Sequence, residues 1–196
     1  MSFSTGGLFL AESVEFARLH QEGEPWSETQ RRACLQGLST LPKAASQQRT
    51  IREISTRIAS LDAKQRMFLI SEADRQEQQA LVWLAACRAY QFLREFSVEV
   101  LRERYLSWRL HLGLESFNTF YASKAEWDEG LAGLSGSTRG KLRQVLFRMM
   151  REAGILSRDG EIQRVGLSNR LYSLIESGGR SDLLIFPGVD ARNEVK

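Results

Sequence analysis

Residues 136–156 carry side chains that could hold phosphate groups. This stretch reads GSTRGKLRQVLFRMMREAGIL, and it places five cations against the single carboxylate of Glu152. Guanidinium and ammonium groups bind phosphate through charge-assisted hydrogen bonds, and a guanidinium can donate two of them at once. The five cations are Arg139, Lys141, Arg143, Arg148 and Arg151. The chemistry that this stretch predicts is therefore the binding of a polyanion.

The apolar residues of the same stretch predict a helix that carries the cations on its outer side. At about 100° per residue, the apolar side chains fall on one stripe, and the cations and Gln144 occupy the other sides without a carboxylate to neutralise them. The stripe consists of Leu142, Val145, Leu146, Met149, Met150 and Ala153. We predict a helix over residues 138–153, with Ser137 as its N-cap and Gly154 as its C-terminal stop. Its start, at Ser137 and Thr138, would offer unpaired backbone N–H groups to a phosphate.

The elements around this helix have the order of a helix-turn-helix. Two short helices are expected over residues 115–123 and 125–134, and the turn SGS separates them from the basic helix. In such motifs the last helix lies in the major groove of DNA. Residues 157–165 could add a small β-wing, with Arg158 and Arg164 beside the DNA backbone. The alternative is a solvated amphipathic helix with a plain hairpin behind it.

A second basic helix is expected in the first third of the chain. A helix capped by Ser27, the turn LSTLPK and a helix over residues 47–61 again follow the order of a helix-turn-helix. The side chains here that could contact phosphates or base edges are Lys43, Gln48, Arg49 and Arg52. The alternative is again a solvated surface, because Arg57 can pair with Glu53 four residues earlier.

The charge distribution and composition of the whole chain fit this interpretation. Residues 31–70 hold eight bases and two acids, and residues 131–170 hold eight bases and three acids, although the net charge is only +3. Basic segments that alternate with acidic ones are a reason to consider a polyanionic partner. Good helix formers dominate the composition, and the chain has only three prolines. We therefore expect an all-α, compact multi-helix globular fold with helix-turn-helix elements.

Two units are predicted within this helical chain. An N-terminal helical unit would cover residues 1–112, with the possible helix-turn-helix at 27–61. A C-terminal unit, resembling a helix-turn-helix or winged helix, would cover residues 113–196.

The region between the two basic helices is expected to supply the centre of the fold. A long helix is predicted over residues 72–96, because it is apolar on nearly all sides. Asp62 is expected to cap a short helix before it, and Ser97 to cap a helix over residues 98–111 after it.

Side chains for catalysis or metal binding are sparse. Cys34 and Cys87 lie in apolar helical patterns, which indicates reduced core residues, and the chain has only two histidines. The acids show no magnesium-binding pattern, and GSTRGK lacks the spacing and the preceding strand of a phosphate-binding loop. We therefore expect no metal or other cofactor, no small-molecule substrate and no enzymatic activity.

The apolar runs of the sequence are short. The longest covers residues 80–87, whereas a membrane-spanning helix needs about 20 residues. The N-terminal residues also lack the pattern of a signal peptide. We expect a cytoplasmic protein that does not enter a membrane.

Several stretches, in this order, resemble the BrxA family, a core family of the BREX phage-defence systems with a NusB-like helical fold. They are GGLFLAES at 6–13, RTIREISTRIASL at 49–61, EFSVEVLRERY at 95–105, STRGKLRQVLFRMMREAGIL at 137–156 and LSNRLYSLI at 167–175. The resemblance implies an all-helical protein with helix-turn-helix elements that binds double-stranded DNA and has no enzymatic activity. It also implies action beside a BREX methyltransferase and other defence proteins.

A second hypothesis is a protein–protein adaptor or assembly subunit, in which contact with DNA is secondary. The acidic segment 71–130 could face a basic protein while the basic segments face DNA. Aromatic side chains could anchor such an interface, and packing in the core is the alternative for most of them. They are Trp83, Trp108, Phe117, Phe120, Tyr121 and Trp127.

Overall fold

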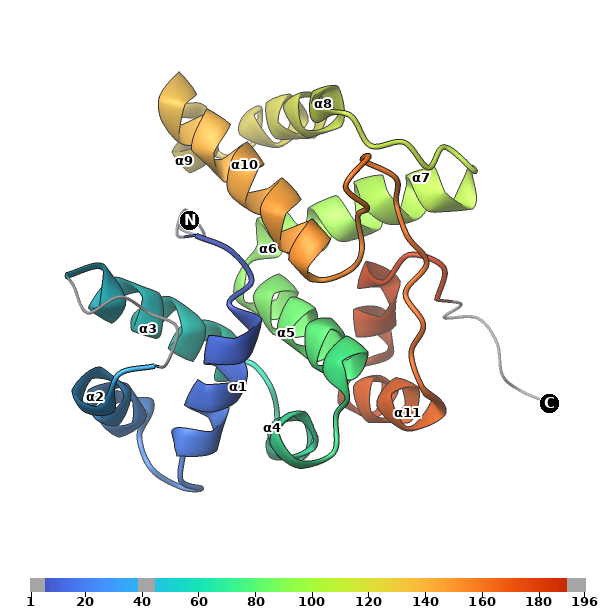
Figure 1. Cartoon of the computed structure of the whole chain (residues 1–196). Coiled ribbons are helices and arrows are strands. Elements are labelled where there is room, and N and C mark those ends of the chain that lie inside the picture. The colour runs from blue at the N-terminus through green and yellow to red at the C-terminus, as the bar shows by residue number, and fades with distance from the viewer. Residues whose placement is uncertain (1–5, 39–44, 190–196) are drawn as a thin grey trace.

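The regular structure of this chain is helical. A computed structural model describes residues 6–38 and 45–189, and every regular element among them is a helix (Figure 1). The first elements are α1 (Leu10–Leu19), α2 (Trp26–Gln36), α3 (Ala45–Ile58), α4 (Ala63–Ser71), α5 (Arg75–Ala89) and α6 (Gln91–Phe96). They are followed by the π-helix η1 (Ser97–Arg102), α7 (Glu103–Leu106), α8 (Leu114–Ala125), α9 (Glu129–Ala132), α10 (Gly136–Glu152), α11 (Asn169–Gly178) and the 3₁₀-helix η2 (Arg180–Ile185). The predicted all-α fold is confirmed.

Helix α5 is the centre of the fold. All of its residues from 80 to 87 are buried, and Trp83 has no exposed surface. Helices α1, α3, α4, α6 and η2 all contact it, and Figure 1 shows it in the middle of the molecule. A helix that is apolar on most sides must be covered on most sides, so α5 gathers the other elements around it. Within the described residues, no helix is both long enough and apolar enough to cross a membrane.

The predicted long helix over residues 72–96 is wrong, because the chain turns at Tyr90. Helix α5 ends at Ala89, and Tyr90 has extended backbone (φ −130°, ψ 105°) before the helix resumes in α6. Ser97 caps no helix, since its hydroxyl lies inside a helical run and donates to the carbonyl oxygen of Leu93, 2.7 Å away. The turn brings Phe92 against the aromatic side chains of α8 instead of carrying it further along α5.

These aromatic contacts hold α8 against α6. The ring of Phe92 lies 5.9 Å from that of Phe117 and 5.1 Å from that of Phe120, measured between ring centroids. Helix α10 then packs on the core through its predicted stripe, and Phe147, outside that stripe, is buried as well. The buried stripe members are Leu142, Val145, Leu146, Met149 and Met150 within α10, with Ala153 just after it.

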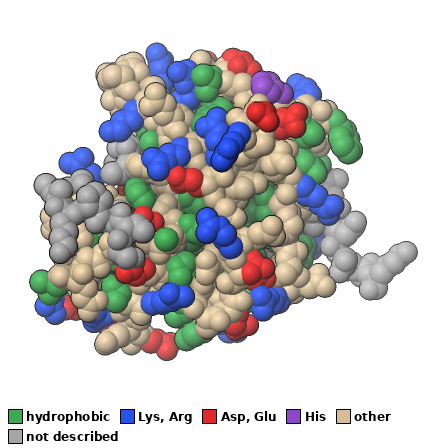
Figure 2. Space-filling model, in the orientation of Figure 1, with side chains coloured by type: hydrophobic (Ala, Val, Ile, Leu, Met, Phe, Trp, Pro, Cys, Tyr) green, Lys and Arg blue, Asp and Glu red, His purple; other side chains and the backbone are tan. Residues whose placement is uncertain are grey.

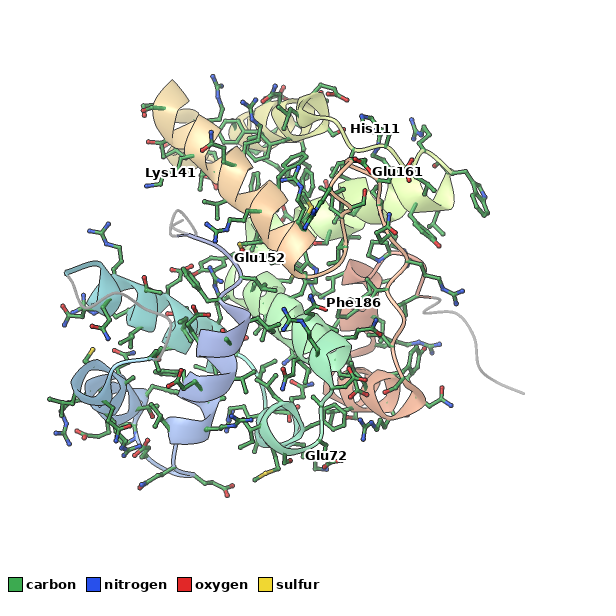
Figure 3. All side chains as sticks on the ribbon, viewed as in Figure 1. Glu72, His111, Lys141, Glu152, Glu161 and Phe186 are labelled. Atoms are coloured by element: carbon green, nitrogen blue, oxygen red, sulfur yellow. The ribbon has the colours of Figure 1, made fainter. Side chains whose placement is uncertain are left out.

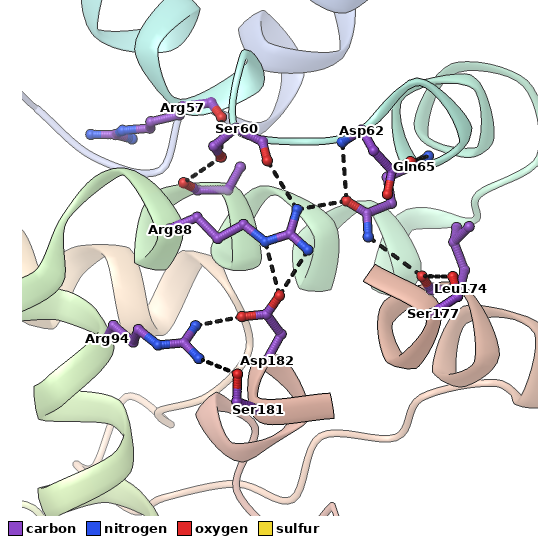
Figure 4. A network of polar contacts seen from close by, with 11 residues as sticks. Arg57, Ser60, Asp62, Gln65, Arg88, Arg94, Leu174, Ser177, Ser181 and Asp182 are labelled. Atoms are coloured by element: carbon purple, nitrogen blue, oxygen red, sulfur yellow. Dashed lines mark hydrogen bonds and ion pairs between the residues drawn. The ribbon is translucent and has the colours of Figure 1, made fainter. Parts of the chain in front are cut away.

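A polar network joins α4, α5 and η2 (Figure 4). Asp62 caps α4 as predicted, because its carboxylate accepts from the backbone N–H of Gln65 at 2.8 Å. The guanidinium of Arg88 donates to the side-chain oxygen of Gln65 at 2.8 Å and to the carbonyl oxygen of Ser60 at 2.9 Å. It also donates twice to the carboxylate of Asp182, at 2.9 and 2.8 Å. One arginine therefore fixes three elements.

The predicted β-wing over residues 157–165 does not form as strands. Two isolated bridges, between Leu156 and Ile162 and between His111 and Glu161, hold this segment as a short turn against residues 110–112. Pairing stops after residue 163 because the backbone N–H of Val165 donates instead to the carbonyl oxygen of Pro187, at 3.0 Å. The division of the chain into two units at residue 112 stays a prediction.

Candidate nucleic-acid interface

Helix α10 begins two residues earlier than its sequence predicts. Ser135, not Ser137, is the N-cap, and its hydroxyl oxygen accepts from the backbone N–H of Thr138 at 3.2 Å. Helix α9 ends at Ala132, which leaves Ser135 as the extended residue that a cap requires (φ −61°, ψ 153°). Ser137 and Thr138 therefore lie in the first turn of α10, where Ser137 is exposed and Thr138 half-buried.

The N-terminal half of α10 presents three cations, Arg139, Lys141 and Arg143, which we call the α10 cationic face. Arg139 and Lys141 are exposed, and Arg143 is half-buried. Their contacts are with neutral groups, since Arg139 lies 5.5 Å from the ring centre of Tyr121 and Arg143 donates to the side-chain oxygen of Asn118 at 3.1 Å. No ion pair involves them in the part of the chain that the structure describes.

The figures place this face on the outside of the molecule. Figure 2 shows Lys and Arg side chains gathered over the surface where Figure 1 has α10. Figure 3 shows Lys141 projecting away from the body of the protein, whereas Glu152 lies at the other end of α10, nearer α5. Gln144, which the sequence also assigned to the outer side, is exposed.

A hollow of about 380 Å³ lies between α8 and α10. Arg139 and Arg143 line it from two successive turns of α10, and Asn118 closes it from α8. Two glycines complete the lining, Gly136 and Gly140, and a Cβ atom at either would meet no other atom within 4 Å. Two guanidinium groups thus flank an open space next to the start of a helix, an arrangement that suits an oxyanion.

The C-terminal half of α10 uses part of its charge within the protein. Nε of Arg148 donates to Oε1 of Glu152 at 2.7 Å, so the prediction that no carboxylate neutralises the outer side is wrong at this position. The two residues are four apart, which places them on the same side of the helix. Arg151 is exposed and lies 6.0 Å from the ring centre of Phe147.

Helix α3 shows the same mixture of exposed and internal cations. Gln48, Arg49 and Arg52 are exposed, whereas Arg57 is fully buried. Arg57 donates to Glu53 at 2.8 Å, so the pairing weighed from the sequence is confirmed. A hollow of about 270 Å³ between α2 and α3 contains Gln48 and Arg52 in its lining. Lys43 lies outside the described residues.

The helix before α3 differs at its start from its prediction. Helix α2 begins at Trp26, directly after Pro25, so Ser27 lies within its first turn and is not its cap. The ring of Trp26 stacks on that of His20, with 3.8 Å between centroids, and this contact fixes the start of α2 against the end of α1.

Residues 7 and 8 join the two basic helices. On one side, Nη1 of Arg57 donates to the carbonyl oxygen of Gly7 at 2.9 Å. On the other side, the backbone N–H of Leu8 donates to the carboxylate of Glu152 at 2.6 Å. Arg57 and Glu152 therefore hold α3 and α10 to the same short segment, and Figure 1 shows this segment passing between the two helices.

The two predicted wing residues stand apart from the α10 cationic face. Arg158 and Arg164 are both exposed, on the turn that follows α10. Figure 1 shows this turn beside α7, away from the N-terminal end of α10. Arg158 and Arg164 would therefore meet a different part of any bound duplex than Arg139 does.

The model of the BrxA family matches residues 1–179 of the sequence. The chain belongs to the BrxA family. Membership of the BrxA family makes it a protein of the BREX phage-defence systems.

One solved structure supports the fold of this BrxA-family chain. An uncharacterized protein from Magnetospirillum magneticum has 22% sequence identity and a TM-score of 0.74, and the match covers 95% of this chain and 96% of that one. At this identity the likeness concerns the fold alone. No curated protein matches the sequence.

Some features of this surface were not predicted from the sequence. Asn118 lines the hollow beside α10, and its only signal in the sequence is its place in the first of the two short helices that precede the basic helix.

Cys34 is exposed, contrary to the prediction of a core residue, because the buried side of α2 is formed by Thr29 and Ala33. Cys87 is buried as predicted, and burial raises the pKa of its thiol to about 12. Among the described residues, no group of three or more His, Cys, Asp or Glu side chains could hold a metal ion.

Proposed function

We propose that this BrxA-family protein binds double-stranded DNA, mainly through phosphate contacts from basic helices, and that it catalyses no reaction. The observation that carries the proposal is the α10 cationic face. Arg139 and Lys141 are exposed and Arg143 is half-buried on the outer side of α10, and the described partners of the two arginines are neutral groups. Three cations without carboxylates are available to replace the counterions of a phosphate backbone, which is the main source of affinity in such complexes.

The order of elements gives a docking geometry. Helices α8, α9 and α10 have the order of a helix-turn-helix, with α10 as the helix that enters the major groove. In this arrangement the hollow lined by Arg139 and Arg143 receives one phosphate, and the first turn of α10 directs N–H groups towards it. Because phosphates carry no sequence information, we expect modest sequence preference, with Gln144 as a possible contact to a base edge.

Two further regions, helix α3 and the turn after α10, would contact the DNA backbone as well. Helix α3 would add phosphate contacts through Gln48, Arg49 and Arg52, with Lys43 in the connection before it. Arg158 and Arg164 would contact the backbone from the turn after α10. Arg148 would contribute less than Arg143, because its guanidinium is already paired with Glu152.

The proposed setting follows from the family. We propose that the protein acts in the cytoplasm beside other BREX proteins, including the methyltransferase complex, without a cofactor or a small-molecule substrate. A role as an assembly subunit is the second candidate, and the exposure of Trp108 (85%) and Trp127 (89%) favours it.

A salt titration of DNA binding tests the proposal. With about five phosphate contacts, the affinity for a random-sequence duplex should fall roughly 10²–10³-fold between 50 and 200 mM salt. The triple variant R139Q/K141Q/R143Q should bind weakly at either salt concentration while its helical circular dichroism signal is retained. The matched control is K64Q/R75Q/R109Q, which removes three exposed cations elsewhere. A flat titration, or equal losses in both variants, would overturn the proposal.

A further inference from the structure

A third hollow, of about 600 Å³, lies where α5 and α6 meet α8 and α9. Its size falls within the range of about 300–1,000 Å³ that is usual for ligand sites. Tyr90 lines it from the turn between α5 and α6, Phe92 lines it from α6, and Leu131 lines it from α9. Trp127 stands at its edge, on the connection between α8 and α9, and is 89% exposed. We call this hollow the Trp127 pocket.

The aromatic lining of the Trp127 pocket suits a cation. Phe92 and Leu131 are buried and form an apolar floor, whereas Tyr90 is half-buried and Trp127 is exposed. The faces of aromatic rings carry partial negative charge and attract ammonium and guanidinium groups, and tryptophan does so most strongly. An exposed tryptophan beside a hollow also has the chemistry of an interface anchor.

The charges around the Trp127 pocket favour the same kind of ligand. Glu95 and Asp128 contribute carboxylates to its lining, and Lys124 is the one cation among the described residues of that lining. The ammonium of Lys124 lies 2.9 Å from a carboxylate oxygen of Glu95 and 2.7 Å from one of Glu99. The lining therefore holds two carboxylates and one ammonium, and that ammonium is already paired with Glu95 and with Glu99 outside the lining.

Lys124 is thereby prevented from recruiting an anion. Burial alone would lower the pKa of Lys124, but hydrogen bonds to Glu99 and Glu95 raise it above its usual value. The C-terminal end of α5 and the N-terminal end of α6 meet in the lining, so their opposite partial charges offset each other and the carboxylates set the sign of the pocket. A phosphate backbone would be repelled here, in contrast to the hollow beside Arg139 and Arg143.

We propose that the Trp127 pocket binds a lysine or arginine side chain from a basic segment of another protein. The cationic group would lie against Trp127, with its charge directed towards Glu95 and Asp128. The ring of Tyr90 forms part of the wall only, because the guanidinium of Arg57 already lies 5.7 Å from its centre. Charge complementarity and the exposed tryptophan argue for this occupant. The site does not depend on the proposed function, because it involves neither DNA nor the α10 cationic face.

The position of the pocket allows both sites to be occupied together. Asn118 lines the hollow beside α10, and Lys124 lines the Trp127 pocket. These residues are six positions apart on α8, which corresponds to about 240° around the helix. The DNA surface and the protein surface thus lie on different sides of α8.

Peptide binding tests the proposal. The probe is a fluorescein-labelled Gly-Ser peptide with a central Arg-Lys-Arg, and the control peptide carries citrulline and norleucine at those positions, which keeps the shape and removes the charge. Anisotropy titrations should show binding of the basic peptide and at least about tenfold weaker binding of the neutral one. Trp127→Ala should weaken binding about tenfold, the size expected for a cation–π contact of more than 1 kcal/mol.

Two further variants separate the pocket from general effects. Trp108→Ala removes a tryptophan of similar exposure outside the pocket and should leave peptide affinity unchanged. Asp128→Asn removes a charge but keeps a good N-cap for α9, whose first turn Asp128 now caps, so it should weaken binding without unfolding the protein.

Several results would overturn the proposal. Equal affinity for the two peptides, no binding of either, or equal effects of Trp108→Ala and Trp127→Ala would each do so. Dimerisation of the wild-type protein in sedimentation experiments that Trp127→Ala abolishes would assign the pocket to a second copy of this chain instead. The variant R139Q/K141Q/R143Q should bind the peptide like wild type, so a failure of DNA binding and a failure of this proposal are distinguishable.

Discussion

Two arginine-bearing regions of this protein use the same side chain in opposite ways. In the network of Figure 4, Arg88 and Arg94 both donate to the carboxylate of Asp182. On the α10 cationic face, Arg139 and Arg143 contact only an aromatic ring and a side-chain amide among the described residues. The first region stabilises the fold, and the second presents charge to a ligand. The positions of the acids, not of the arginines, separate the two roles.

The acids that matter can be near or far in the sequence. Arg57 and Arg148 each have a glutamate four residues away, and each pairs with it. Arg139 and Arg143 have no acid within four residues on either side. Arg88, in contrast, pairs with an aspartate 94 residues away. A local search for acids therefore identifies the unpaired cations of α10 and the partner of Arg57, but it fails for Arg88, whose partner is distant in the sequence.

The largest effect is expected where the internal network is broken. Asp182→Ala would leave Arg88 and Arg94 without their shared carboxylate in a mostly buried position. We expect the free energy of unfolding to fall by about 3–5 kcal/mol, the usual cost of removing one partner of a buried ion pair. Urea unfolding measures this loss. Asp159→Ala, on an exposed turn, is the control and should change stability by less than about 0.5 kcal/mol. Equal stabilities would show that the network contributes nothing.

A second internal pair predicts a dependence of stability on pH. Hydrogen bonds from Arg170 and Ser168 lower the pKa of the buried Glu77 from 4.5 to about 2, although burial alone would raise it. A carboxylate whose pKa is lowered by folding contributes stability above its unfolded pKa, and this contribution is lost as pH falls towards 2.

The variant Glu77→Gln isolates this contribution. It keeps the acceptor for the backbone N–H of Asp74 but removes the charge. We expect a lower melting temperature than wild type above pH 5, and a difference that narrows steadily as the pH falls from 5 to 2. Melting curves measured by circular dichroism at several pH values provide the test. A constant difference across that range would contradict the linkage.

The sequence predicted α10 well because its pattern is local. Its stripe of apolar residues and its lack of nearby acids depend only on residues within one helix, and the structure confirms the buried stripe. The predicted N-cap, Ser137, was wrong, because Ser135 is an equally good capping residue two positions earlier. Only the end of α9 at Ala132 decides between them.

Features that depend on distant contacts could not be predicted. The turn at Tyr90 reflects the aromatic contacts of Phe92 with α8, which lies more than twenty residues further along the chain. Likewise, the pairing of Asn118 with Arg143 joins two helices whose packing no local pattern specifies. The DNA contacts themselves stay predictions.

Two arginines of α10 allow a comparison, within one helix, of an arginine that pairs with a carboxylate and one that does not. Arg143→Gln should weaken DNA binding about five- to tenfold at low salt and reduce the slope of affinity against salt by about 1. Arg148→Gln should have a smaller effect, because Arg148 already pairs with Glu152. Salt titrations of the two single variants measure the difference. A larger loss for Arg148→Gln would mean that its pair opens on binding and that internal pairing does not predict the role of an arginine.

The smallest expected effect concerns a glycine in the hollow beside α10. A Cβ at Gly140 would meet no atom within 4 Å, and alanine is the better helix former. Gly140→Ala should therefore raise the free energy of unfolding by about 0.5–1 kcal/mol. The same methyl group would project into the space that a phosphate is proposed to occupy, so DNA affinity should fall about twofold, which corresponds to about 0.4 kcal/mol. Ser173→Ala, on an exposed side of α11, is the control. It should also change the free energy of unfolding, but it should leave DNA affinity unchanged. If Gly140→Ala stabilises the protein and leaves DNA affinity unchanged, the hollow does not receive a phosphate, and the α10 cationic face binds DNA through its outer side alone.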